Sequence, residues 1–94
     1  MPTVSRQVVV CNKLGLHARP AMEFVHAANA FSSAVHVHKR SDSPVSVDGK
    51  SIMEMLTLEA VQGTPLEISA DGDDAAAAVD KLVALFESGF GEEI

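Results

Sequence analysis

The apolar residues of this chain follow two different spacings, which alternate along its length. Segments with apolar side chains at every second position, or rich in valine, are typical of β-strands. Segments with apolar side chains three or four positions apart are typical of amphipathic helices. The predicted element order is therefore βαββαβα. The strands are expected at 4–11, 35–39, 45–48 and 66–70, and the helices from 18 to about 30–33, at 52–60 and at 75–86.

This order restricts the fold class. Alternating strands have one polar and one buried face, which favours an antiparallel sheet covered by helices on one side. We therefore predict an α+β fold of the open-faced sandwich type. The 94 residues, 47% of them hydrophobic, suffice for a single domain spanning 1–94. A core of this size leaves room for a surface site but not for a deep enclosed pocket.

Composition argues against several classes of function. The chain has no Trp or Tyr, four Phe and a net charge of −6, which disfavours a nucleic-acid binder. No apolar run approaches the ~20 residues that a membrane span needs, so no membrane insertion is expected. The single cysteine, Cys11, cannot form an internal disulfide and fits a reducing cytoplasm. A cytoplasmic protein is therefore expected.

Charge is distributed unevenly along the chain. Residues 1–50 carry six basic and three acidic side chains, whereas residues 51–94 carry one basic and ten acidic side chains. The difference can reflect an ordinary solvated surface. It can also mark a locally basic patch that receives an anion or an acidic partner.

The segment 12–21 contains the strongest candidate site. His17 stands where the N-cap of the first helix is expected, although His is not a favoured cap. The free amides and positive dipole of a helix N-terminus favour a bound anion, which the guanidinium of Arg19 could also reach. No acidic residue lies within five positions of His17, so a carboxylate partner would have to come from elsewhere in the chain.

These features suggest that His17 is a nucleophile. Its imidazole would accept a phosphoryl group, which the backbone amides and Arg19 would stabilise. On the residues alone, a second interpretation stays open. In that interpretation His17 only ends a strand and packs locally.

Two blocks of the sequence resemble a known family. Residues 15–21, GLHARPA, resemble the active-site signature of HPr, the histidine-containing phosphocarrier of the bacterial phosphotransferase system. Residues 50–53, KSIM, together with Leu58 and the QGT at 62–64, resemble the regulatory-serine segment of that family. The resemblance extends over nearly the whole chain and includes the element order.

The resemblance implies a fold and a phosphocarrier function without catalytic turnover. The fold is a four-stranded antiparallel sheet in the order 1-4-2-3, covered on one face by three helices.

The resemblance also implies roles for single residues. His17 takes phosphate on Nδ1 from phosphorylated enzyme I, which phosphoenolpyruvate charges, and passes it to an enzyme IIA domain. Ala18 and Arg19 hold the phosphoryl group, and HPr kinase/phosphorylase modifies Ser51. Neither a cofactor nor a metal is implied. The residues expected to contact partners are Ile52, Met53 and Leu56.

The short helix near Ser51 also carries predictions from its own pattern. Residues 51–54, SIME, match the capping box, in which the Ser hydroxyl and the Glu carboxylate each accept an amide hydrogen bond. Apolar residues surround most of the helix, more than one buried stripe requires, so part of the set should be exposed. A docking surface and a more deeply buried helix both remain open. Phosphorylation of Ser51 is expected to weaken transfer from enzyme I without changing the fold.

Some features of the sequence are compatible with functions other than a phosphoryl carrier. His36 and His38 share one face of a strand and could bind a metal, but no further ligands are evident nearby. A regulatory docking module and a small ligand-binding domain with an incidental His17 remain as alternatives. A monomer is the natural form for a carrier that is passed between partners.

Overall fold

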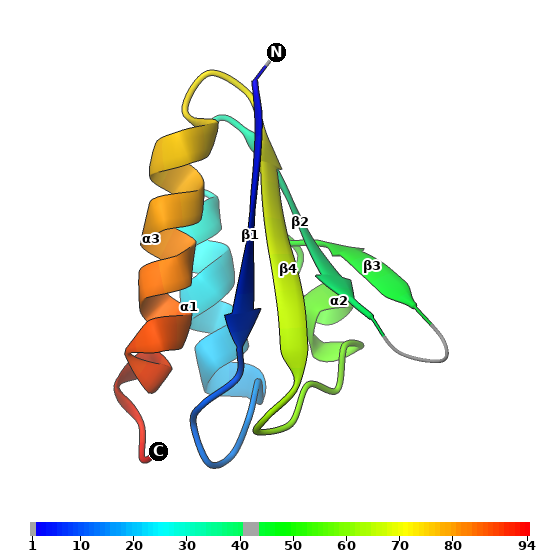
Figure 1. Ribbon diagram of the computed structural model, residues 1–94, viewed down its shortest axis with the longest axis vertical. Coiled ribbons are helices and arrows are strands. Elements are labelled where there is room, and N and C mark those ends of the chain that lie inside the picture. The colour runs from blue at the N-terminus through cyan, green and yellow to red at the C-terminus, as the bar shows by residue number, and fades with distance from the viewer. Residues whose placement is uncertain (1, 41–43) are drawn as a thin grey trace.

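A computed structural model describes residues 2–40 and 44–94 of the chain (Figure 1). The helices and strands follow in the predicted order βαββαβα, and a short 3₁₀ turn comes after the last helix. The elements are β1 (Thr3–Val9), α1 (Ala18–Ala28), β2 (Ala34–Lys39), β3 (Val45–Asp48), α2 (Ile52–Leu56), β4 (Pro65–Asp71), α3 (Ala75–Glu87) and η1 (Gly89–Gly91).

The four strands form one antiparallel sheet in the order β1-β4-β2-β3. The register places Ile68 of β4 opposite Val37 of β2, which in turn lies opposite Val47 of β3. All three side chains are buried, so the alternation seen in the sequence sets which face points inward. The predicted strand order and the β2–β3 hairpin are confirmed. Part of the predicted turn of that hairpin, residues 41–43, lies outside the described residues.

The helices cover one face of the sheet, with α1 and α3 side by side (Figure 1). The rings of Phe24 in α1 and Phe86 in α3 meet edge to face, with centroids 5.8 Å apart. Within the described ranges, no helix combines the length and the apolar character needed to cross a membrane. The largest fully buried apolar side chains are Phe24, Phe86, Met55, Leu58, Ile68 and Leu82.

Two details of α2 differ from the prediction. The helix ends at Leu56 rather than at residue 60, and Glu59 takes a left-handed conformation, with φ of 48°, that a continuing helix cannot contain. The capping box is only half formed. Ser51 Oγ accepts from the amide of Glu54 at 3.2 Å, but the Glu54 carboxylate accepts from the amide of Asp48, also at 3.2 Å. The prediction that it would accept from Ser51 is wrong.

Two other elements are shorter than predicted. β1 ends at Val9 because the carbonyl of Val10 accepts from the amide of Gly63 rather than from that of Thr64, whose amide donates to Val61. α1 ends at Ala28, where the side chain of Asn29 donates to the carbonyl of Val25 at 2.9 Å. The same carbonyl also accepts from the backbone amide of Asn29 at 2.9 Å, so this side chain reinforces the last turn of α1.

Candidate functional site

The loop between β1 and α1 is fixed in place just before His17. Gly15 has a φ of 70°, and a Cβ at this position would lie 2.5 Å from the carbonyl oxygen of Ala60. The conformation and the close approach therefore both require glycine. The next amide, that of Leu16, donates to the same Ala60 oxygen at 2.8 Å, and the Leu16 side chain is buried. These contacts determine where the chain enters α1.

His17 is the N-cap of α1, as the sequence predicts. Its backbone is extended, its carbonyl accepts from the amide of Ala21 at 3.1 Å, and its side chain makes no capping bond. The imidazole is 37% exposed. The amides of Ala18 and Arg19 lie in the first turn, where the helix itself supplies no acceptor, and Pro20 has no amide hydrogen. An accessible ring therefore stands beside the positive end of a helix.

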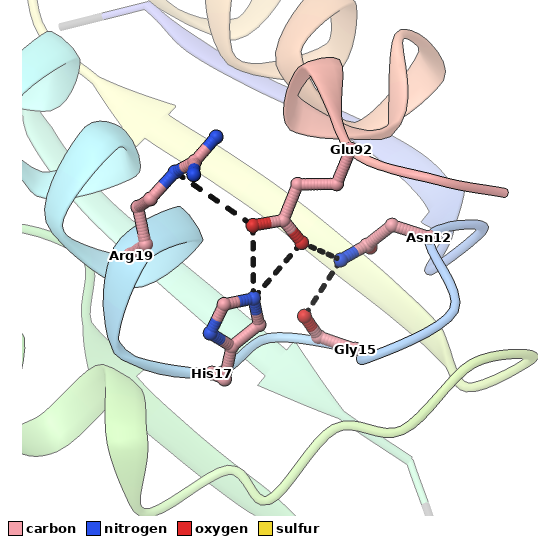
Figure 2. Close-up of polar contacts among 5 residues, drawn as sticks. All are labelled: Asn12, Gly15, His17, Arg19 and Glu92. Atoms are coloured by element: carbon pink, nitrogen blue, oxygen red, sulfur yellow. Dashed lines mark hydrogen bonds and ion pairs between the residues drawn. The ribbon is translucent and has the colours of Figure 1, made fainter.

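The carboxylate partner of His17 is Glu92, which follows η1 (Figure 2). His17 Nε2 lies 2.9 Å from each of its two carboxylate oxygens. Nδ1 lies on the side of the ring away from Glu92 (Figure 2). The Nε of Arg19 is 3.8 Å from Glu92 Oε2, and the Arg19 side chain is 69% exposed. The structure thus brings His17 and Arg19 together around one carboxylate.

Glu92 is itself held by the loop. Asn12, which is fully buried, donates through Nδ2 to Glu92 Oε1 at 3.0 Å and to the carbonyl of Gly15 at 2.7 Å. The hydrogen bond with His17 is the main cause that lowers the pKa of Glu92. Desolvation raises the pKa, while the Asn12 bond and the positive charge of Arg19 lower it further. Glu92 is therefore an ionised acceptor at neutral pH.

Reasoning from the sequence missed Glu92, and it included Asn12 in the segment 12–21 without giving it a role in the site. The two lie 75 and 5 positions from His17 in the chain, on opposite sides of it. The only sequence feature that marks the region of Glu92 is Phe90 between two glycines, where a bulky apolar residue that can be buried stands between two flexible residues. No spacing rule connects that pattern with a histidine so far away in sequence.

The second predicted group lies on α2, which packs beside α1. Ser51 is the N-cap of α2, and among the described residues no hydrogen bond or ion pair joins it to His17 or Arg19. Met55 is fully buried, whereas other apolar side chains of α2 are exposed. The expectation that part of the apolar set is exposed is therefore confirmed. The exposed members are Ile52 at 38%, Met53 at 82% and Leu56 at 39%.

Among the described residues, no third potential metal ligand joins the two strand histidines. The rings of His36 and His38 are stacked with centroids 6.5 Å apart, and Nε2 of His38 lies 3.2 Å from Ser69 Oγ. Across residues 2–40 and 44–94, no group of three or more His, Cys, Asp or Glu side chains is placed to hold a metal ion.

Comparison with known proteins agrees with this geometry. The family model described as "PTS HPr component phosphorylation site" matches residues 4–88, most of the chain. The chain belongs to the HPr family. It is accordingly a phosphocarrier of the bacterial phosphotransferase system and not itself a catalytic enzyme. The predicted family membership is confirmed.

Proteins named NPr and proteins named HPr both resemble this chain over nearly its full length. It is 42% identical to phosphocarrier protein NPr of Proteus mirabilis, over 97% of this chain and 99% of that protein. It is 40% identical to phosphocarrier protein HPr of Neisseria meningitidis, over 95% and 97%. The crystal structure of HPr-C-His from Thermoanaerobacter tengcongensis matches with a TM-score of 0.82 at 44% identity, covering 100% of both chains.

Proposed function

We propose that His17 accepts a phosphoryl group from phosphorylated enzyme I and passes it to enzyme IIA domains, with phosphoenolpyruvate as the original donor. The observation that supports this most strongly is the exposed imidazole of His17 at the N-terminus of α1, with Nδ1 turned away from Glu92 (Figure 2). The carrier is proposed to act in the cytoplasm as a monomer, with residues 1–94 as one domain.

In the proposed transfer, the lone pair of His17 Nδ1 attacks phosphorus. A new N–P bond forms while the bond to the donor histidine of enzyme I breaks and its electron pair returns to that ring. The amides of Ala18 and Arg19 and the Arg19 guanidinium are the donors available to the phosphoryl oxygens. Because Pro20 offers no amide, the stabilisation is moderate, which suits a group that must leave again.

The exposed side chains of Ile52, Met53 and Leu56 are the proposed contact surface for partners. An exposed apolar patch is typical of protein–protein contacts, and methionine adapts to surfaces of different shape. Because α2 packs beside α1, a partner on this surface would also cover His17. Such cover would keep water from a labile phosphohistidine.

Ser51 is the proposed site of regulatory phosphorylation by HPr kinase/phosphorylase. Phosphate would add roughly −1.5 to −2 charges at the N-terminus of α2, where the helix dipole tolerates negative charge. The charge would instead repel acidic partner surfaces beside Ile52 and Met53. Ser51→Asp is therefore expected to keep the native circular dichroism spectrum and to slow transfer from enzyme I. An unchanged transfer rate with a native spectrum would contradict this role.

Labelling with radioactive phosphoenolpyruvate and enzyme I tests the proposed function. The wild-type chain should acquire an acid-labile, alkali-stable phosphate, and His17→Ala should acquire none. His26→Ala is a matched control, because His26 lies on the same helix in its last turn. Equal labelling of His17→Ala and the wild type would refute the proposal. Labelling by ATP at Ser51 alone would favour a purely regulatory module.

A further inference from the structure

We propose that Glu92 is a positioning residue that keeps the hydrogen of the neutral His17 ring on Nε2 and so leaves the lone pair on Nδ1. This inference rests on the proposed function, because it explains why Nδ1 rather than Nε2 would attack phosphorus. It concerns a side chain that lies far from the signature segment 15–21 in sequence and contacts its histidine directly.

Hydrogen-bond chemistry fixes the tautomer. An ionised carboxylate can only accept hydrogen bonds, so the ring nitrogen facing Glu92 must be the donor. Nε2 lies at the same distance, 2.9 Å, from both Glu92 oxygens, so its hydrogen is shared between them. A neutral imidazole has a single N–H, and with that hydrogen on Nε2 the other nitrogen, Nδ1, carries the free lone pair.

A turn after α3 brings this carboxylate to the site. Gly89, Phe90 and Gly91 have positive φ values of 63°, 55° and 72° in succession, so the chain turns out of the right-handed helix at this point. The left-handed conformation is unfavourable for phenylalanine. It is offset by burial of the Phe90 ring, whose centroid lies 4.9 Å from that of Phe86. Glu92 is thus carried by an anchored segment.

Two contacts from the β1–α1 loop secure the segment beside His17. The amide of Lys13 donates to the carbonyl of Glu93 at 2.8 Å, and the buried Asn12 side chain donates to Glu92 Oε1. The Glu92 side chain is consequently only 12% exposed, whereas that of its neighbour Glu93 is 78% exposed. Of these two adjacent glutamates, one is built into the site and the other faces solvent.

The same contact affects the charge that develops during transfer. When Nδ1 forms its bond to phosphorus and Nε2 keeps its hydrogen, the ring becomes cationic and no proton leaves. Glu92 then faces this positive charge across the existing hydrogen bond, and charge-assisted bonds are stronger than neutral ones. Glu92 would therefore stabilise both the transition state and the phosphorylated ring, as carboxylates that orient histidines do elsewhere.

The test combines nitrogen NMR with transfer kinetics. Long-range ¹H–¹⁵N correlation spectra of the unphosphorylated protein identify which nitrogen of His17 carries hydrogen. The wild type should show the Nε2–H form, and Glu92→Leu should show a mixture of both tautomers. The maximal rate of phosphorylation by enzyme I should fall roughly tenfold or more in Glu92→Leu. Glu93→Leu, which removes the same charge from the adjacent position, should change neither measurement.

The outcomes separate this inference from the proposed function. A wild-type ring with its hydrogen on Nδ1, or a Glu92→Leu variant with wild-type tautomer and rate, would overturn the positioning role while leaving the carrier function intact. Absence of any labelling in the wild type would overturn the carrier function. The tautomer spectra would still decide the role of Glu92, since they require no enzyme I.

Discussion

The carboxylate of Glu92 meets Nε2 of His17 with both oxygens at 2.9 Å, although the two residues are 75 positions apart in the chain. One belongs to the cap of the first helix, and the other follows the turn after the last helix. The site is therefore assembled from both ends of the described fold. Its geometry depends on the anchoring of residues 89–93 as well as on the signature segment.

The contrast between two methionines of α2 tests the docking surface. Met53 is 82% exposed and Met55 is fully buried. Met53→Ala should leave the free energy of unfolding within about 0.5 kcal/mol of the wild type and weaken binding to enzyme I by about 1–2 kcal/mol. Met55→Ala should lower stability by about 2–5 kcal/mol. Urea unfolding and calorimetric titration measure the two effects. Unchanged enzyme I affinity in Met53→Ala would contradict the assignment.

Replacement of Gly15 tests how the loop positions His17. Gly15 and Gly91 have nearly the same φ, 70° and 72°, but only at Gly15 would a Cβ meet backbone atoms. Gly91→Ala should cost about 1 kcal/mol of stability through its backbone conformation. Gly15→Ala should cost about 1–3 kcal/mol more, because Ala60 must also move. Equal losses in urea unfolding would show that the close approach to Ala60 does not constrain the loop.

Glu59 offers a stabilising substitution. It is exposed and has a φ of 48°, a conformation that costs a residue with a Cβ about 1–2 kcal/mol relative to glycine. Part of the gain from Glu59→Gly is offset by the greater freedom of glycine in the unfolded chain, leaving about 0.5–1 kcal/mol. Thermal unfolding should therefore shift upward in Glu59→Gly. Glu59→Ala keeps the strain, and a similar shift in that variant would instead implicate the charge.

Asp74 should make stability depend on pH in the acid range. Its carboxylate accepts from Ser33 Oγ and from the amides of Ser32 and Ser33, the amides at 2.9 Å each. These bonds, led by that of the Ser33 hydroxyl, lower the pKa of Asp74 to about 2. The value lies below the ~3.9 of an unfolded chain. Asp74 thus stabilises the fold above about pH 4, and this contribution is lost as the pH falls toward 2.

The comparison of Asp74→Asn with the wild type isolates that contribution. The variant should unfold at lower urea concentration at pH 7, and the difference between the two proteins should shrink between pH 4 and pH 2. Asp73→Asn, a change at the exposed preceding residue, should follow the wild type at every pH. A stability difference for Asp74→Asn that stays constant down to pH 2 would contradict the sign of the shift.

Much of the fold could be predicted because local pattern and tertiary packing agree. Val37 and Ile68 alternate with polar neighbours, and the sheet buries the face that this alternation indicates. The same agreement explains why His17 could be placed at a helix cap from the break after β1. The end of α2 could not be predicted, because the left-handed turn at Glu59 has no glycine to mark it.

The part of the site formed by Glu92 could not be predicted, for a different physical reason. Contacts such as those of Glu92 with His17 and Asn12 depend on how the segment after α3 packs against the loop between β1 and α1. Neither the spacing of apolar residues nor capping preference predicts such a tertiary contact. The same limit applies to Glu54, whose carboxylate accepts from the amide of Asp48, while the expected partner, the amide of Ser51, donates to the carbonyl of Asp48.

The most direct test of the central claim is the identity of the phosphorylated atom. The uniformly ¹⁵N-labelled chain should be treated with enzyme I and phosphoenolpyruvate, and its ¹⁵N–³¹P couplings should be recorded. The account predicts a coupling to Nδ1 of His17 and to no other nitrogen. A coupling to Nε2 of His17, or a phosphate on any other residue, would contradict it.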